Sequence, residues 1–181
     1  WSIIPKDNVP EDPNAPQTPE QKGSTDVLMV AIHNEVLANY QGLASKTGLQ
    51  PTFLEIELFS AVRAVLEQGI SAQMIVDMGA STTKLYVIER GILRTSHVIN
   101  KGSQDITLAI SQSLSISVAE AENMKRVLGL AGGPEHKELT ELITVTLDYI
   151  FYEANRVLFN YQKKYNHTIT KVIMTGGGVL L

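Results

Sequence analysis

The residues best suited to chemistry lie between two apolar runs, in the segment AQMIVDMGASTTKLYVIERG (residues 72–91). Asp77 ends the first run, where a carboxylate is costly unless it meets a cation such as hydrated Mg²⁺. A turn with one glycine and three hydroxyl side chains follows: Gly79, Ser81, Thr82 and Thr83. Glycine permits close backbone approach, and hydroxyls beside backbone N–H groups form a nest for phosphate oxygens. The segment therefore favours a phosphate cradle, with a polar hairpin turn as the alternative.

A second glycine cluster, Gly176, Gly177 and Gly178, also follows an apolar run. Consecutive glycines offer no side chain for packing, which favours a flat or bulky ligand against the backbone. A flexible hinge or a cut chain end is the alternative. The cluster is neither a G-x-G-x-x-G fingerprint nor a Walker loop, because no Gly-Lys-Ser/Thr follows it.

Three more charged residues are candidates at helix positions. Glu122 and Lys125 are three residues apart and so project from one helix face, either as a solvated ion pair or as a pair that grips ribose hydroxyls. Glu57 opens another predicted helix, where an acid ordinarily complements the helix dipole. The four histidines lack the spacing of metal ligands, so no metal site built from protein ligands is predicted.

Apolar periodicity predicts the elements that position these residues. Strands are expected in the runs at 1–5, 27–33, 51–57, 92–100 and 170–175 and in both runs of the opening segment. Helices are expected at 35–47, 58–68, 103–114, 118–128 and about 139–165. Asn34 is the predicted cap of the first helix, and Gly48, Gly69 and Gly129 are the predicted ends of three helices. Hairpins and strand–helix–strand units together predict an α/β fold with a mixed sheet.

Composition limits the class of protein. The 181 residues are 44% hydrophobic and 19% charged, which is typical of a folded globular chain. The net charge of −4 argues against a dedicated nucleic-acid binder. The absence of cysteine excludes thiol chemistry in these residues and favours a reducing cytosol. No apolar run reaches the ~18 residues of a membrane span. The chain starts at Trp1 and stops at GGGVLL, so we expect a piece of a longer protein.

Taken in order, these motifs resemble those of the actin-like ATPase superfamily. VDMGASTT is similar to the second phosphate loop of that superfamily (Asp-x-Gly-x-x-Thr-Thr), and VIMTGGG is similar to its adenosine motif. AEAENMKR resembles the segment that carries a Glu-x-x-Lys pair for the ribose, and EIELFSAVRAVL resembles the connecting helix whose leading acid orients the hydrolytic water. Within the superfamily, residues 26–130 and, less closely, 139–178 resemble the PilM family, FtsA-like proteins of type IV pilus assembly.

The resemblance implies ATP and Mg²⁺ as cofactors, bound in a cleft between two lobes. Asp77 would order Mg²⁺ through water, Gly79 and Ser81–Thr83 would hold the β- and γ-phosphates, and Glu122 with Lys125 would hold the ribose. Gly176–Gly178 would flank the base and the α-phosphate, and Glu57 would position water. A counterpart of the first phosphate loop is absent from these residues, so we expect little or no hydrolysis from this chain.

The implied fold is the actin-like ATPase (ribonuclease H-like) fold, an α/β fold with a mixed sheet, flanking helices and part of a small inserted α+β domain. Its expected divisions are an inserted-domain part at 1–55 with a Pro-rich loop at 5–25, a connecting helix at 56–70, and a second lobe at 71–181. That lobe would consist of a core at 71–112 and 166–181 and a helical subdomain at about 113–165.

The function implied by the resemblance is that of a nucleotide-binding platform at the cytoplasmic face of the inner membrane, without a membrane span of its own. Its partner would be the cytoplasmic N-terminal tail of a PilN-like membrane protein, and self-association is a further expected interaction. An FtsA-like division protein, a small-molecule kinase of the same superfamily, and an interaction module without nucleotide are the alternatives.

Overall fold

The computed structural model describes residues 2–3, 25, 27–66, 71–131 and 133–181. The chain divides into two compact units, Trp1–Ile56 and Glu57–Leu181. The described residues include no helix that is both long and apolar enough to cross a membrane. The candidate residues named above all belong to the second unit.

The first unit contains strands β1 (Ser2–Ile3) and β2 (Val27–Leu28), which pair antiparallel, and helix α1 (Asn34–Thr47). The left-handed end of α1 at Gly48 (φ 69°) is as predicted. The capping role predicted for Asn34 is wrong, because the N-cap is His33.

Two strand predictions in the first unit are also wrong. The run at 27–33 forms a strand only over Val27–Leu28 and has no buried residue, and residues 51–56 form no strand. A strand needs a neighbour with which to exchange backbone hydrogen bonds. The described part of this unit provides one only for Val27–Leu28. Apart from Thr25, the predicted Pro-rich loop at 5–25 lies outside the described residues.

The second unit is built on a four-stranded sheet with the order β5-β4-β3-β6. Its strands are β3 (Gln73–Met78), β4 (Thr83–Glu89), β5 (Ile92–Ile99) and β6 (Lys171–Thr175). The pairs β3–β4 and β4–β5 are antiparallel, whereas β3 and β6 are parallel. The prediction of an α/β fold with a mixed sheet is therefore confirmed.

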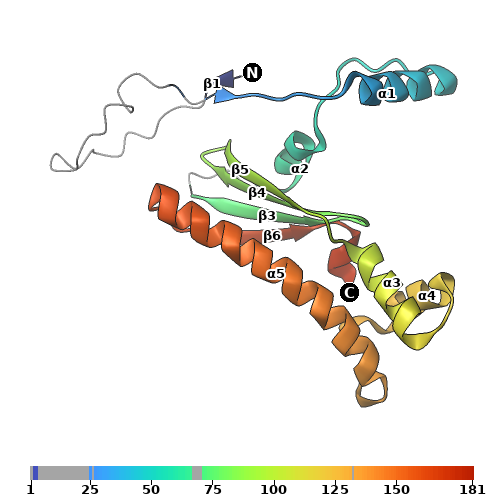
Figure 1. Cartoon of the computed structure of the whole chain (residues 1–181). Coiled ribbons are helices and arrows are strands. Elements are labelled where there is room, and N and C mark those ends of the chain that lie inside the picture. The colour runs from blue at the N-terminus through green and yellow to red at the C-terminus, as the bar shows by residue number, and fades with distance from the viewer. Residues whose placement is uncertain (1, 4–24, 26, 67–70, 132) are drawn as a thin grey trace. The chain divides into compact units, whose positions relative to one another are not determined.

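Both faces of the sheet are covered within this unit, as Figure 1 shows, with α2 (Glu57–Val65) on one side and α5 (Lys137–Tyr165) on the other. Side chains alternate between the faces along each strand. Met74, Val76, Met78, Leu85, Val87 and Ile99 share a core with the long helix. Ile75, Tyr86 and Ile88 are buried on the opposite face, where Leu58 is the buried residue of α2.

The remaining helices are α3 (Ser103–Leu114) and α4 (Val118–Leu128), and short 3₁₀ turns lie at Gly129–Ala131, Pro134–His136 and Gly177–Leu180 (η2, η3 and η4). The predicted helices of this region are confirmed, with Gly129 as the C-cap of α4. The long apolar stripe of α5 is buried at Leu139, Ile143, Leu147, Ile150, Ala154, Val157 and Tyr161. Helix α2 ends at Val65, earlier than predicted, and Gly69 lies outside the described residues.

Candidate functional site

The segment between β3 and β4 is a hairpin. Met78 and Thr83 form the last pair of the two strands, and the Gly79 N–H donates a hydrogen bond to the Thr82 carbonyl over 3.0 Å. A Cβ atom on Gly79 would lie 3.0 Å from that same carbonyl oxygen. The turn is therefore tight enough to favour glycine at this position without a ligand. The hairpin alternative is therefore correct for the backbone. It does not exclude a phosphate at the tip, because Ala80 and Ser81 are exposed.

The tip of the hairpin is fixed against the start of α3. The Ser103 N–H donates to the Gly79 carbonyl at 3.0 Å, and the Gln104 N–H donates to the Ala80 carbonyl at 2.8 Å. Gly102 permits this approach, because a Cβ atom there would lie only 2.4 Å from the Ala80 carbonyl oxygen. Sequence reasoning missed Gly102, and its place just before a helix gave no sign that another loop lies against it.

The three hydroxyl residues of the hairpin differ in exposure. Ser81 is exposed and Thr82 is partly exposed. Thr83 is fully buried, and its hydroxyl donates to the Lys101 carbonyl at 2.8 Å. This hydrogen bond connects the hairpin to the segment that leads into α3. A phosphate contact from Thr83 stays a prediction, and Ser81 and Thr82 are the more accessible hydroxyls.

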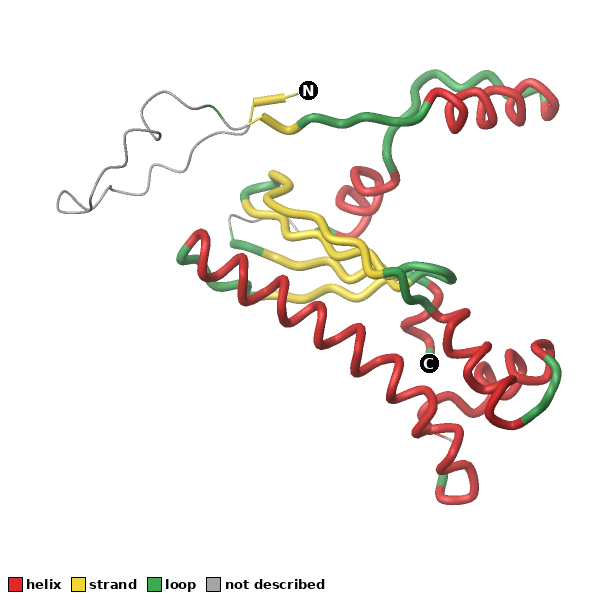
Figure 2. The backbone as a smooth tube through the Cα atoms, viewed as in Figure 1, coloured by secondary structure: helices red, strands yellow, loops and turns green. Residues whose placement is uncertain are grey.

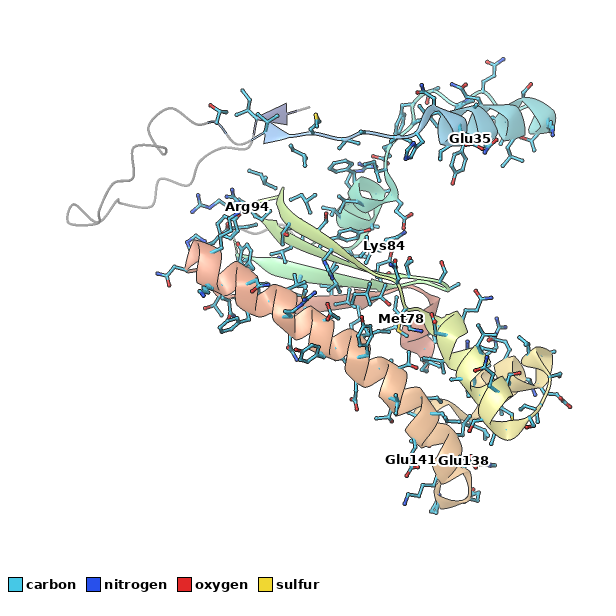
Figure 3. The ribbon with its side chains drawn as sticks, viewed as in Figure 1. Glu35, Met78, Lys84, Arg94, Glu138 and Glu141 are labelled. Carbon is cyan, nitrogen blue, oxygen red and sulfur yellow. The ribbon has the colours of Figure 1, made fainter. Side chains whose placement is uncertain are left out.

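Asp77 and Glu57 are brought near one another across the α2 face of the sheet. Asp77 is partly buried and pairs in register with Lys84. Glu57, the first residue of α2, forms an ion pair with the Lys84 ammonium. Burial, and then the negative charges of Glu57 and Asp77, raise the pKa of Tyr86 to about 12. Figure 3 shows Lys84 on the side of the sheet that carries α2.

This arrangement is compatible with Mg²⁺ but not with a cage made of protein ligands. No group of three or more histidine, aspartate or glutamate residues among the described part of the chain could hold a metal ion. Mg²⁺ usually keeps several waters and takes one or two carboxylates together with substrate phosphates. Asp77, beside an accessible hairpin tip, has the donor chemistry for that kind of site.

The three glycines after β6 have different surroundings. Gly176 has a φ of 91°, and a Cβ atom there would lie 2.4 Å from the Met78 carbonyl oxygen and 2.8 Å from Asp77 Oδ1. A Cβ atom on Gly178 would lie 2.4 Å from Met78 Cγ, whereas one on Gly177 would meet nothing within 4 Å. The packing of η4 on the end of β3 thus accounts for Gly176 and Gly178 without a ligand. Gly177 alone of the three has an open side.

Glu122 and Lys125 form a network that is more buried than their spacing suggested. The Lys125 ammonium donates to the Ser103 carbonyl at 3.1 Å and to Thr107 Oγ1 at 2.8 Å, and it lies 2.7 Å from Glu122 Oε2. The Lys125 side chain is 7% exposed and that of Glu122 is 34% exposed. Hydrogen bonds from Lys125 and then Thr107 lower the pKa of Glu122 to about 2, with a further contribution from Arg126.

Two adjoining hollows connect this network with the hairpin and with the glycine turn. They have volumes of about 720 and 480 Å³ and share four residues: Ser103, Glu122, Lys125 and Arg126. The larger hollow extends to Ala80 at the hairpin tip, and the smaller one extends to Gly177 and Leu181. We call the two together the α3–α4 groove. Thr107 and Arg126 also line the groove, and both contact Glu122. The sequence alone did not indicate either residue.

The sequence is similar to that of FtsA proteins. The family model for the cell division protein FtsA matches residues 74–150. The FtsA of Bacillus subtilis is 31% identical over 115 residues, which make up 62% of this chain and 26% of that protein.

Solved structures give the same picture for the fold. The PilM–PilN type IV pilus biogenesis complex matches with a TM-score of 0.67 at 22% identity, over 80% of this chain and 41% of the other. The ethanolamine utilization protein EutJ of Carboxydothermus hydrogenoformans matches with a TM-score of 0.61 at 25% identity, over 76% and 47%. MreB5 of Spiroplasma citri bound to AMPPNP matches with a TM-score of 0.64 at 17% identity, over 84% and 56%. The chain thus spans about half or less of the length of most of these proteins, and its fold is that of the actin-like ATPases.

Proposed function

We propose that this chain, an FtsA-like member of the actin-like ATPases, is the part of a larger protein that binds ATP with Mg²⁺ in the α3–α4 groove. One observation carries the proposal. Ala80 at the hairpin tip, the Glu122–Lys125 pair and Gly177 line the two adjoining hollows of this groove, although they come from three distant parts of the sequence. A polar hairpin, a surface ion pair and a hinge would each have explained one motif but not their convergence.

The groove suggests a division of roles at its ribose end. Three acceptors surround the Lys125 ammonium, which has three hydrogens to donate. The partly exposed Glu122 carboxylate is therefore the better acceptor for ribose hydroxyls, and Lys125 holds that carboxylate in place. At the phosphate end, Ser81 and Thr82 would supply hydroxyls, with Gly79 and Thr83 shaping the hairpin.

The two acids on the α2 face, Asp77 and Glu57, would position the Mg²⁺ ion and the attacking water. Asp77 would order Mg²⁺ through water, where the ion would offset phosphate charge. Glu57 would position water, and its ion pair with Lys84 holds the carboxylate in place. Gly176–Gly178 would flank the base and the α-phosphate, with Gly177 closest to the ligand.

Changing Asp77 is expected to weaken nucleotide binding only when Mg²⁺ is present. In the full-length protein, Asp77→Ala and the isosteric Asp77→Asn should each raise the Kd for Mg·ATP about tenfold, which corresponds to about 1.4 kcal/mol. Isothermal titration calorimetry with Mg²⁺ and with excess EDTA measures both conditions. Glu141→Gln, which removes an exposed acid that does not line the groove, is the control. Equal Mg·ATP affinity in all four proteins would rule out the proposed site.

We further propose that the larger protein is a platform of type IV pilus assembly at the cytoplasmic face of the inner membrane. Its partner would be the N-terminal tail of a PilN-like membrane protein. The structural similarity to a PilM–PilN complex supports this role. A role in cell division is the second candidate, because both the family model and the curated relative are FtsA proteins.

A gene deletion distinguishes the two roles. If the protein is a pilus platform, the deletion should abolish surface pili and leave cell length unchanged, because only the assembly machine loses a component. Electron microscopy of pili and cell-length measurement give the two readouts, with the complemented strain as the control. Long undivided cells that still carry pili would instead establish the division role.

A further inference from the structure

Helix α5 carries a second apolar stripe on the side opposite its buried one. Val145, Tyr149, Tyr152 and Phe159 are 70%, 49%, 67% and 65% exposed. Val145, Tyr152 and Phe159 follow one another at intervals of seven residues. At 100° per residue they lie on one line along the helix, and this line faces away from Ile143, Ile150 and Val157 in the core. We call these four exposed residues the α5 seam.

The seam lies at the outside of the second unit. Figure 1 and Figure 2 show α5 as the outer layer of this unit, with the sheet on only one of its sides. Single exposed apolar residues need no explanation, but four large ones at coiled-coil spacing on one side of a helix indicate a surface for another helix. Two of them are tyrosines, a residue type that is enriched in protein interfaces.

The charges beside the seam indicate which helix would lie there. Acids stand in its first half and bases in its second half, at Glu141, Asp148, Arg156 and Lys163. Asp148 and Arg156 lie four residues on either side of Tyr152, and Glu141 and Lys163 lie eleven residues on either side. Val145 and Phe159 lie seven residues on either side. The same helix reversed about Tyr152 therefore places acid against base and apolar against apolar.

We propose that a second copy of this chain docks on the α5 seam, antiparallel, about a two-fold axis at Tyr152. Such an interface is self-complementary, so each pair occurs twice: Asp148 with Arg156, Glu141 with Lys163, and Val145 with Phe159. A parallel dimer would instead place acids beside acids and bases beside bases. The segment 141–163 is about 33 Å long at 1.5 Å per residue. One helix pair of that length gives a small interface. We therefore expect a weak dimer whose population depends on protein concentration.

Contacts within the chain leave these charges available. Arg156 pairs with Glu153 at 2.6 Å, and Glu141 pairs with Lys137 at 3.6 Å. The Lys137–Glu141 pair lies on the helix surface and contributes only a few tenths of a kcal/mol. Glu153 is only 12% exposed, but the Arg156 side chain keeps 54% of its surface exposed. A partner carboxylate or ammonium can share these side chains at little cost.

A charge-swap series tests the pairing and its direction. Sedimentation equilibrium of the full-length protein should give a monomer–dimer equilibrium, with a dissociation constant that rises about tenfold in Asp148→Arg and in Arg156→Asp, because each sets like charges against each other. The double variant Asp148→Arg/Arg156→Asp should regain most of the wild-type affinity. The proposal would be overturned if the wild-type protein were monomeric at every concentration. In that case the rest of the chain or another protein would cover the seam. A double variant no better than either single one would overturn it equally.

A cysteine at the two-fold axis gives an independent test. The 181 residues contain no cysteine, and Tyr152→Cys would place two thiols near each other only in the proposed dimer. Mild oxidation with copper phenanthroline should convert most of this variant to a disulfide-linked dimer on a non-reducing gel. Val127→Cys, at a position that is 71% exposed on α4, is the matched control, together with the unmodified protein. Equal cross-linking of the two cysteine variants, or none in either, would contradict the two-fold seam.

Discussion

Replacing Gly176 with alanine is expected to destabilise the second unit by about 3 kcal/mol. Its φ of 91° is strained for any residue with a side chain, and the new Cβ atom would lie 2.4 Å from the backbone carbonyl oxygen of Met78. Relief would require the parallel strands β3 and β6 to separate at their ends, where Asp77 and Thr175 pair. Chemical denaturation followed by circular dichroism measures the loss.

The neighbouring glycine provides the matched control. A Cβ atom on Gly177 would meet nothing within 4 Å, so Gly177→Ala should change the unfolding free energy by less than about 0.5 kcal/mol. Because Gly177 lines the α3–α4 groove, the same substitution should weaken ATP binding in calorimetry. Equal destabilisation by the two substitutions would show that the turn packs differently from the structure described above. Unchanged ATP affinity in Gly177→Ala would place the nucleotide elsewhere.

Replacing Lys125 with methionine is expected to cost about 2 kcal/mol of stability. The stem of the side chain keeps its volume, but the Ser103 carbonyl, Thr107 Oγ1 and Glu122 Oε2 lose the ammonium that they share. Water reaches the 34% exposed Glu122 carboxylate, which keeps the loss below that of a fully buried pair. Thermal unfolding of the variant and of the wild type at pH 7 measures it.

Arg126→Met is the control for this substitution. Arg126 contacts the other oxygen of the same carboxylate, at 2.8 Å, but its side chain is 76% exposed. Removing it should cost less than about 0.5 kcal/mol, the usual value for a surface pair. If both variants lost the same stability, the burial of Lys125 would not be the source of its effect.

The acid range gives a second readout of the Lys125 substitution. The pKa of Glu122 is lowered from 4.5 to about 2 in the folded chain. A lowered pKa adds stability that is complete above the unfolded-state value of 4.5 and is lost as the pH falls toward 2. The wild type should therefore lose this contribution between pH 4.5 and 2, and Lys125→Met should lose less over the same interval. Parallel acid titrations of the two proteins would contradict the coupling.

Local patterns were enough to predict the elements of the second unit. Helix α4 begins with the capping box of Ser117 and Glu120 and ends at Gly129, all signals that lie within a few residues of each other. The two strands of the hairpin and the long helix α5 were predicted for the same reason. The apolar run at 51–57 formed no strand, and the run at 27–33 formed one only over Val27–Leu28, because a strand depends on a partner that the run itself does not specify.

The candidate site was predicted only as separate motifs. The sequence indicated that Asp77, the hydroxyl turn, Glu122, Lys125 and the three glycines suit a nucleotide, and the order of these motifs gave the resemblance to the actin-like ATPases. Spacing alone described Glu122 and Lys125 as two residues on one helix face. That Lys125 is buried comes from α3, which supplies Ser103 and Thr107 from about twenty residues away.

By itself, then, the sequence of this protein determined the kinds of side chain at the site, the local elements that carry them and the fold family. The tertiary structure decided which members of each motif are accessible. It separates Gly177 from Gly176 and Gly178 and places Thr83 in the core while Ser81 stays exposed. It also decides which of the two apolar stripes of α5 is covered by the sheet. The physical reason is the same in each case: burial depends on residues that are distant in the chain, and local periodicity carries no information about them.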